Sequence, residues 1–204
     1  MIVTLCASAL MALLLAACTD SADAPTHETP DAETPDAQTP AAATPTAGDA
    51  AAFSVTSDAF AEGEAIPAVH TCDGDNTSPP LAWSGAPEGT QAFALILDDP
   101  DAPTDEPFVH FVVYDLPGGE TGLEEGIPVP AQPDAGGFQG RNDFGRTGWG
   151  GPCPPEGETH TYVFALYALD APLGLDAGAT KQQVLDAADG HVLGEARLTG
   201  AYGR

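Results

Sequence analysis

Three stretches of the chain carry side chains whose types and spacing could do chemistry. The first is the acidic, proline-rich segment 98–103 (DDPDAP). The second is His110, which stands among apolar neighbours in FVHFVV, and the third is segment 148–155 (GWGGPCPP), followed by His160 and Tyr162. Imidazolium, phenol and glycine backbone N–H groups are donors that bind an anion. Aspartate and histidine together can instead hold a divalent metal or transfer protons.

Each of these residues also has a simpler structural interpretation. His110 could be a neutral core histidine whose ring is bonded to a backbone carbonyl. Asp99 and Asp101 could close a turn, because Asp-Pro commonly opens one. Segment 73–76 (DGDN) begins like a calcium-binding loop but lacks the later glycine and the distant glutamate of that pattern, so we interpret it as a turn.

No local signature of a catalytic centre accompanies these residues. The sequence has no Gly-x-Ser-x-Gly elbow, no His-Glu-x-x-His, no Walker loop and no Gly-x-Gly-x-x-Gly after a strand. The enzymatic alternative is a hydrolase that uses His110 with Asp99. We expect a binding protein that is not an enzyme and that uses neither a cofactor nor a metal.

Long apolar runs must position these side chains, and they indicate β-strands. Residues 91–97 (QAFALIL), 108–116 (FVHFVVYDL) and 161–169 (TYVFALYAL) are apolar at successive positions, which is typical of strands covered on both faces. Shorter candidates span residues 53–60 and 196–202, and turns rich in proline and glycine separate all five. The predicted fold class is all-β: an antiparallel, Greek-key β-sandwich with one or two short peripheral helices.

One helix is expected between the last two of these strands. Thr180 and Gln183 form a capping-box pattern at its start. Val184 and Ala188 contribute to an apolar stripe along it, and Gly190 supplies a stop. We therefore predict a short amphipathic helix packed against the sandwich.

The composition of the chain excludes several classes of protein. Its 204 residues suffice for one ordinary domain with an appendage, and 43% of them are hydrophobic, so a core can form. The chain has 31 Asp and Glu but only 5 Lys and Arg, which gives a net charge of −26. This charge excludes a typical nucleic-acid binder, because neutralising phosphates requires clustered basic residues. It also argues against docking on an anionic membrane through a basic patch.

The N-terminal residues are typical of an export signal. Residues 2–17 form an apolar run that is too short for a comfortable transmembrane helix and that fits a signal peptide, although no Lys or Arg precedes it. The run ends in LAAC at residues 15–18, which resembles the lipobox of bacterial lipoproteins, where the cysteine is acylated. We predict a signal peptide at residues 1–17 and lipidation of Cys18; ordinary signal cleavage is the alternative.

Residues 18–52 are predicted to be a tether between Cys18 and the folded domain. Thr-Pro recurs every five residues from Thr29 to Pro45, with Ala, Asp and Glu between the repeats. Repeated proline blocks helix and sheet, and few apolar side chains are present to offset the entropy of ordering. The folded domain is therefore expected to span residues 53–204.

Two cysteines remain within the predicted folded domain. Cys72 and Cys153 would reach an oxidising compartment if the chain is exported, and only one intramolecular pairing is open to them. A disulfide between them is possible, and two buried free thiols are the alternative.

The motifs together closely resemble the phosphatidylethanolamine-binding protein (PEBP) family, in particular its bacterial Raf-kinase-inhibitor-like branch. The resemblance rests on the ordered DPDAP, strand histidine, GPCPP and His-x-Tyr elements, and it runs from about Phe53 to Arg204. It implies an antiparallel β-sandwich with a small pocket that binds phosphate, acetate or a phosphoethanolamine headgroup. Carried over by motif, the residues of this anion-binding pocket would be Asp99, Asp101, Pro103, His110, Gly151, Pro152, His160 and Tyr162.

The sequence departs from the family pattern at two positions. Thr161 stands where the family usually has arginine, and Trp149 stands where tyrosine is usual. Because His160 and Tyr162 are two residues apart on a predicted strand, both should face the pocket while Thr161 faces away. The loss of the arginine should therefore leave the pocket intact.

The sequence thus predicts an exported, membrane-anchored lipoprotein of the bacterial cell envelope whose domain faces the periplasm or the exterior. Its expected partner is a small anion such as phosphate or a phospholipid headgroup. No nucleic acid is expected to bind. The alternative is a protein-interaction module that acts like a protease or kinase inhibitor, with a protein as its target.

Overall fold

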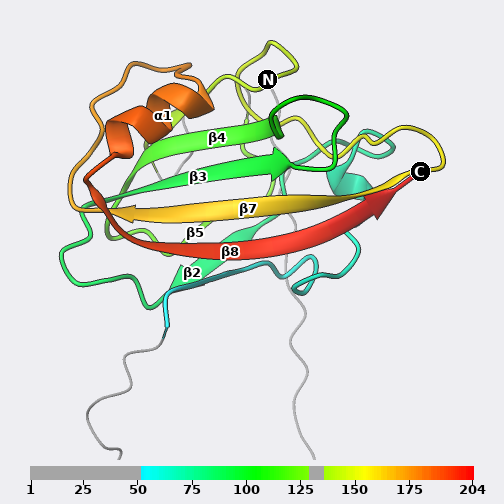
Figure 1. The fold of residues 1–204 in the computed structure, drawn as a ribbon. Helices are drawn as coiled ribbons and strands as arrows, with labels where there is room; N and C mark the ends of the chain where they lie inside the picture. Colours follow the sequence, from blue (N-terminus) through cyan, green and yellow to red (C-terminus); the bar gives the residue numbers. More distant parts are fainter. Residues whose placement is uncertain (1–51, 129–135) are drawn as a thin grey trace, which may run out of the picture. The chain divides into compact units, whose positions relative to one another are not determined.

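The structure is a computed structural model that describes residues 52–128 and 136–204. These residues form two antiparallel β-sheets and one α-helix, α1 (Lys181–Ala188) (Figure 1). This architecture confirms the predicted all-β class with few helices. The predicted signal peptide, Cys18 and all but the last residue of the predicted tether lie outside the described residues.

The larger sheet has five strands and carries the long apolar runs. All of its neighbouring strands are antiparallel. Each of the three long runs forms one strand within a few residues of its expected bounds, and the last strand begins earlier than expected. The strand order is β6 (Phe138–Gln139), β4 (Phe108–Pro117), β3 (Ala92–Asp99), β7 (Thr159–Leu169) and β8 (Val192–Gly203).

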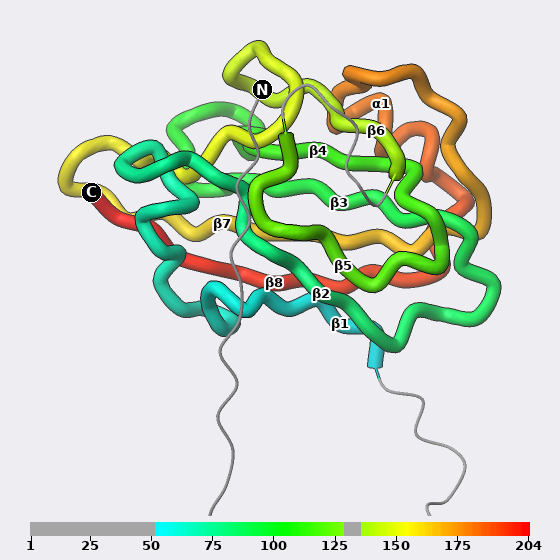
Figure 2. Tube along the Cα trace, turned by 180° about the vertical axis from the view of Figure 1, so that it is seen from behind, coloured from blue at the N-terminus to red at the C-terminus, as the bar shows by residue number. Residues whose placement is uncertain are grey.

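The smaller sheet lies over one face of the larger one, as Figure 2 shows. Its order is β1 (Ser54–Thr56), β2 (Leu81–Ser84) and β5 (Gly122–Leu123). The prediction of a strand over residues 53–60 is wrong beyond Thr56, because the Ser57 hydroxyl donates to Pro80 O and accepts from Ala59 N, which turns the chain. A short 3₁₀ helix, η1 (Ala68–His70), follows this turn.

The three central strands are buried on both faces, as expected from their continuous apolar sequences. On β3, Phe93, Leu95 and Leu97 face the core between the two sheets. Ala92, Ala94 and Ile96 belong to a second core that includes Val184 and Ala188 of α1. Burying a side chain of the size of leucine or phenylalanine contributes roughly 1.5–3 kcal/mol, so the two cores fix the position of β3 from both sides.

Helix α1 begins with the predicted capping box. Gln183 N donates to the Thr180 hydroxyl, and Thr180 N donates to the Gln183 side chain. The helix ends before Gly190, whose φ of 81° suits a residue without a side chain. Lys181 Nζ donates to Asp98 Oδ2 at 2.7 Å, which ties the first turn of the helix to the end of β3.

The structure joins Cys72 and Cys153 in a disulfide. Cys72 follows η1, and Cys153 lies in the glycine- and proline-rich segment before β7. A backbone hydrogen bond from Cys72 N to Pro152 O, at 3.1 Å, runs beside the disulfide. The two loops are therefore held together by a covalent bond and a hydrogen bond.

Replacing both cysteines by serine is expected to lower the free energy of unfolding by about 4 kcal/mol. The physical reason is that the bond links residues 81 positions apart and restricts the unfolded chain. Urea denaturation of the oxidised protein and of the Cys72→Ser/Cys153→Ser variant measures this difference. Wild-type protein treated with a reductant should match the variant, and equal stability of the oxidised protein and the variant would contradict the prediction.

Candidate functional site

The ends of four strands meet at one end of the larger sheet, close to the C-terminus (Figure 1). Asp99 is the last residue of β3, and His110 lies near the start of β4 on one side of it. His160 lies at the start of β7 on the other side, and Arg204 follows the end of β8. Because β3 lies between β4 and β7, the Asp99 carboxylate is placed between the two histidines.

A β-bulge directs His110 toward this end of the sheet. Leu97 pairs with Phe111 and Asp98 pairs with Val109, so His110 has no partner on β3. Phe111 packs in the core between the sheets, whereas Val109 packs in the core beneath α1. Regular alternation would place both side chains on one face of the sheet. The extra residue therefore changes the direction of the side chains along β4, as bulges near functional sites do.

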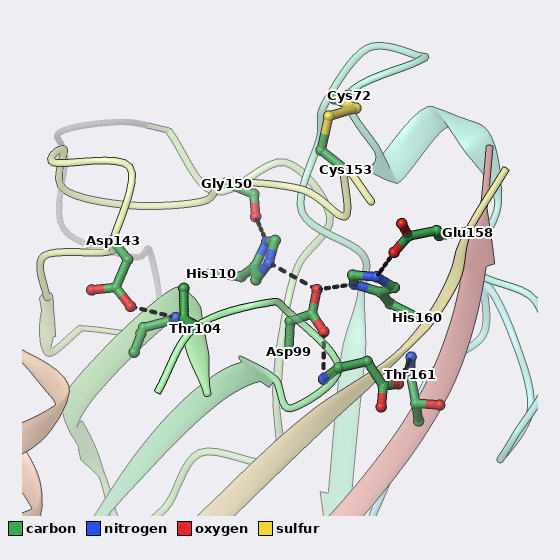
Figure 3. A network of polar contacts seen from close by, with 12 residues as sticks. Cys72, Asp99, Thr104, His110, Asp143, Gly150, Cys153, Glu158, His160 and Thr161 are labelled. Carbon is green, nitrogen blue, oxygen red and sulfur yellow. Dashed lines mark hydrogen bonds and ion pairs between the residues drawn. A yellow bond between two sulfur atoms is a disulfide. The ribbon is translucent and has the colours of Figure 1, made fainter. Parts of the chain in front are cut away.

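The Asp99 carboxylate is the shared partner of both histidines (Figure 3). Its Oδ2 lies 2.8 Å from His160 Nδ1 and 3.9 Å from His110 Nε2. The second nitrogen of each histidine has another partner. His160 Nε2 lies 3.2 Å from Glu158 Oε2. His110 Nδ1 lies 2.7 Å from the Gly150 carbonyl oxygen. Asp99, His110 and His160 are each at most 4% exposed, so their polar atoms interact mainly with one another.

The acidic segment forms a turn that locks Asp99 in place. Asp101 N donates to Asp99 Oδ1 at 3.0 Å, which leaves Oδ2 for the histidines. The Asp101 carboxylate in turn accepts from Thr161 N at 2.7 Å and thereby fastens the turn to β7 (Figure 3). Asp101 therefore closes the turn and supports the site, which is the structural alternative considered for it in the sequence.

The two histidines have opposite electrostatic environments. Burial would lower the pKa of His160, but its hydrogen bonds to Asp99 and Glu158 outweigh burial and raise the pKa above its ordinary value. Since carboxylate oxygens lie at both of its nitrogens and can only accept, the contacts of His160 favour its imidazolium form. Burial lowers the pKa of His110, although Gly150 and Asp99 oppose it. A carbonyl oxygen only accepts, so neutral His110 carries its proton on Nδ1 and presents a lone pair at Nε2.

A pocket of about 360 Å³ opens over these groups, and we call it the His110–His160 pocket. Four of the predicted site residues line it: Asp99, Pro103, His110 and His160. Its other walls are largely apolar or aromatic. They come from Ala102, Thr104, Phe108, Phe144, Cys153, Pro154, Pro155 and Arg204.

Four predicted site residues do not line the pocket. Besides Asp101, Gly151 uses its N–H to donate to Asn76 Oδ1 at 2.8 Å, so this N–H does not face the pocket as a free donor. Pro152 uses its carbonyl to accept from Cys72 N. Tyr162 is fully buried behind the pocket, and its ring meets the His110 ring edge to face at 5.1 Å.

Tyr162 is nevertheless an unusual group. Its buried hydroxyl has no hydrogen-bond partner among the described residues. Burial raises the pKa of Tyr162, and the nearby Asp99 carboxylate raises it further. The phenol is therefore neutral at any ordinary pH and holds a proton close to the site.

Arg204 is the main pocket residue that the sequence did not reveal. Its backbone N–H donates to Glu158 O, which continues the pairing of β7 with β8 and brings its side chain to the pocket. Arg204 Nε donates to Asp73 Oδ2 at 3.0 Å, and Nη1 donates to Pro154 O at 3.4 Å. No local motif marks this residue, because its place follows from strand pairing alone.

The two departures from the family pattern have structural explanations. Thr161 is exposed between the buried His160 and Tyr162, so an arginine at this position would point away from the pocket, as expected. Trp149 is buried, with its ring 5.5 Å from that of Phe111, and it does not line the His110–His160 pocket.

Two features of the described residues bear on other classes of function. In residues 52–128 and 136–204, no group of three or more His, Cys, Asp or Glu side chains is arranged to hold a metal ion. No helix within the same ranges is long and apolar enough to cross a membrane.

Comparison with known proteins decides the family. Residues 56–203 match the family described as phosphatidylethanolamine-binding protein. The chain belongs to this family. It is 51% identical over 146 residues to a UPF0098 protein of Methanothermobacter thermautotrophicus, covering 72% of this chain and 95% of that protein. It is 45% identical over 132 residues to the UPF0098 protein YbcL of Escherichia coli, covering 59% and 70% respectively.

Two crystal structures of PEBP-family proteins resemble the described fold. YbcL of Escherichia coli, described as a member of the mammalian PEBP family, aligns with a TM-score of 0.70 at 37% identity, covering 76% of this chain and 99% of YbcL. A PEBP homolog of Chlamydia trachomatis aligns with a TM-score of 0.67 at 38% identity, covering 74% and 97%. The predicted family is thus confirmed by sequence and by fold.

The opposite environments of the two histidines predict that His160 titrates at higher pH than His110. A pH titration followed by NMR of the imidazole resonances measures both. Asp99→Asn removes the hydrogen-bonded charge and should lower the pKa of His160. A lower pKa for His160 than for His110 in the wild type would contradict this account.

The same shifts have opposite consequences for stability. The contribution of His160 is fully present below the unfolded-state pKa of about 6.5 and is lost as pH rises through the raised folded-state pKa. The contribution of His110 is present above about 6.5 and is lost as pH falls through the lowered folded-state pKa.

Proposed function

We propose that the chain is an exported, lipid-anchored PEBP-family protein that binds a small anion, such as phosphate or a phospholipid headgroup, in the His110–His160 pocket. The observation that carries this proposal is the pair of histidines from β4 and β7 that share the Asp99 carboxylate beside the pocket. A pocket of about 360 Å³ suits such a ligand, since small-molecule sites span roughly 300–1,000 Å³.

The positive groups at the pocket explain how so acidic a protein would hold an anion. The His160 imidazolium offsets the charge of Asp99, and the Arg204 guanidinium adds a cation at the wall. Salt screens the distant carboxylates over about 10 Å, so contacts inside the pocket dominate. The apolar walls of proline and phenylalanine strengthen these contacts, because a hydrogen bond gains strength in a low dielectric.

His110 makes anion binding depend on pH. When neutral, it presents a lone pair at Nε2, which repels an anion. Protonation turns Nε2 into a charged donor that faces the Asp99 carboxylate and the pocket. Binding an anion should therefore be coupled to the uptake of one proton by His110, and affinity should rise as pH falls through its lowered pKa.

A zwitterionic headgroup would fit the mixed charges better than a bare anion. Its phosphate would meet His110 and Arg204, while an ammonium group would meet the carboxylate of Asp99. This choice agrees with the name of the family, phosphatidylethanolamine-binding protein. Phosphoethanolamine should accordingly bind more tightly than inorganic phosphate.

The hydrogen bonds of the two histidines favour recognition over turnover. In a hydrolytic triad an aspartate orients one imidazole nitrogen, and the other nitrogen activates a nucleophile. His160 is oriented by Asp99, but its other nitrogen is occupied by Glu158. His110 has a free Nε2, yet the Gly150 carbonyl orients it and Asp99 lies 3.9 Å away.

Calorimetric titration with phosphate and with phosphoethanolamine tests the proposal. We expect binding to strengthen as the pH is lowered from about 7.5 to about 5.5, because acid and the bound anion both favour the protonated form of His110. Replacing His160 by alanine should weaken binding by about tenfold or more, since it removes the positive charge that offsets Asp99 beside the pocket.

His191→Ala serves as the matched control, because His191 is exposed and pairs with Asp170 away from the pocket. This variant should bind like the wild type. The absence of binding of either ligand at about pH 5.5, or equal losses in the His160 and His191 variants, would overturn the proposal.

Export and anchoring rest on the sequence of the first 52 residues. An acylated Cys18 would hold the protein at a membrane, since each buried CH₂ contributes about 0.8 kcal/mol and two or more chains make a stable anchor. The tether, with its recurring Thr-Pro pairs, would separate the domain from the bilayer. The protein would then reside in the bacterial cell envelope, with its domain facing the periplasm or the exterior.

Cys18→Ser should release the protein from the membrane fraction of a bacterial host and abolish the incorporation of labelled palmitate. Cys72→Ser is the matched control, because Cys72 lies in the folded domain and its loss should leave fractionation unchanged. Retention of the Cys18 variant in the membrane, with the label still incorporated, would contradict lipidation at this residue.

A further inference from the structure

A second pocket of about 360 Å³ opens elsewhere on the domain and shares no lining residue with the His110–His160 pocket. We propose that this second pocket is a separate binding site for a small oxyanion. It is lined by Asn76, Thr77, Ser78, Gly126, Ile127, Arg146 and Trp149. Asn76 ends the acidic DGDN segment, and Trp149 is one of the two departures from the family pattern; the His110–His160 pocket explains neither.

The second pocket has no carboxylate in its lining, although the chain has 31 Asp and Glu. Three other pockets on the domain each contain at least one. The first has Asp58, Glu120 and Glu124, the next has Asp99, and the third has Glu106 and Asp143. An anion entering the second pocket therefore meets no negative charge on its walls. This is the arrangement that an anion site requires in a strongly acidic protein.

Arg146 supplies a positive charge that the fold does not neutralise. None of the ion pairs among the described residues includes it. Its guanidinium carbon lies 5.2 Å from the centre of the Phe144 ring, which restricts the side chain through a cation–π contact. The guanidinium is thus oriented, charged at every ordinary pH and available to a ligand.

Two further donors line the pocket with hydrogens that have no acceptor among residues 52–128 and 136–204. Asn76 Oδ1 accepts from Gly151 N, which fixes the amide so that Nδ2 carries the free hydrogens. The Ser78 hydroxyl accepts from Ile127 N, and within the described parts of the chain its own hydrogen has no acceptor. A surplus of donors without acceptors favours a ligand rich in oxygen acceptors.

Trp149, which also lines the second pocket, is another donor without an acceptor in the described ranges. It is 5% exposed, and its indole N–H has no hydrogen-bond partner among the described residues. The other tryptophan, Trp83, is equally buried but donates its indole N–H to Glu120 O at 2.8 Å. A buried donor without an acceptor costs about 1–3 kcal/mol. Because Trp149 lines the second pocket, an anion bound there would change the surroundings of its indole ring.

The test is a sulfate titration of the full-length ¹⁵N-labelled chain, followed at the two tryptophan indole resonances. Sulfate should shift the Trp149 resonance saturably and leave that of Trp83 in place, because Trp83 has its own acceptor. Chloride at the same ionic strength should shift neither. Arg146→Gln should weaken the sulfate response by about tenfold or more, because it removes a charge-assisted contact.

Two matched variants separate this site from general charge effects and from the His110–His160 pocket. Arg141→Gln makes the same change in net charge at a residue that lines a different pocket, so the Trp149 response should persist. His160→Ala should also preserve it, which makes the outcome independent of the proposed function. The proposal is overturned if Trp149 does not respond, if Arg146→Gln responds like Arg141→Gln, or if the response disappears with His160.

Discussion

The site depends on one buried carboxylate that two histidines share. Asp99 ends the central strand β3, and its neighbours β4 and β7 bring His110 and His160 to either side of it. An ionised carboxylate at 3% exposure requires a positive partner, because burying an unpaired charge is costly. The His160 imidazolium is that partner. Much of the surrounding structure holds Asp99 and His160 within hydrogen-bonding distance of each other.

Several features of the fold serve this arrangement. The turn through Asp101 ties the end of β3 to β7, and the bulge at His110 turns the imidazole toward Asp99. The Gly150 carbonyl then fixes which nitrogen of His110 carries the proton. Gly151 packs so closely on the His70 carbonyl and Asn76 that a side chain there would collide with both, so this position requires glycine.

The sequence predicted the parts of the fold that rest on long patterns. Residues 91–97, 108–116 and 161–169 were recognisable because strands buried on both faces need uninterrupted apolar sequence. Strands β2, β5 and β6 have two to four residues each, too few to show a pattern, and tertiary contacts decide them. The capping box of α1 was local and therefore visible.

The site residues that lie in local sequence motifs could be predicted. Asp99, His110 and His160 lie in local motifs, and the structure brings them together at one pocket. Gly151 and Tyr162 were also predicted to line this pocket, but the structure places neither of them in its lining. Whether an N–H or a hydroxyl faces a cavity depends on long-range partners such as Asn76. Arg204 was missed because only the pairing of β7 with β8 brings it to the pocket.

A crystal structure of the protein grown with phosphate at about pH 5.5 tests the central claim most directly, since acid and the bound anion both favour the protonated form of His110. The account predicts phosphate in contact with His110 Nε2 and Arg204, with the His160–Asp99 hydrogen bond intact. Phosphate bound only elsewhere, or two histidines that do not share Asp99, would contradict it.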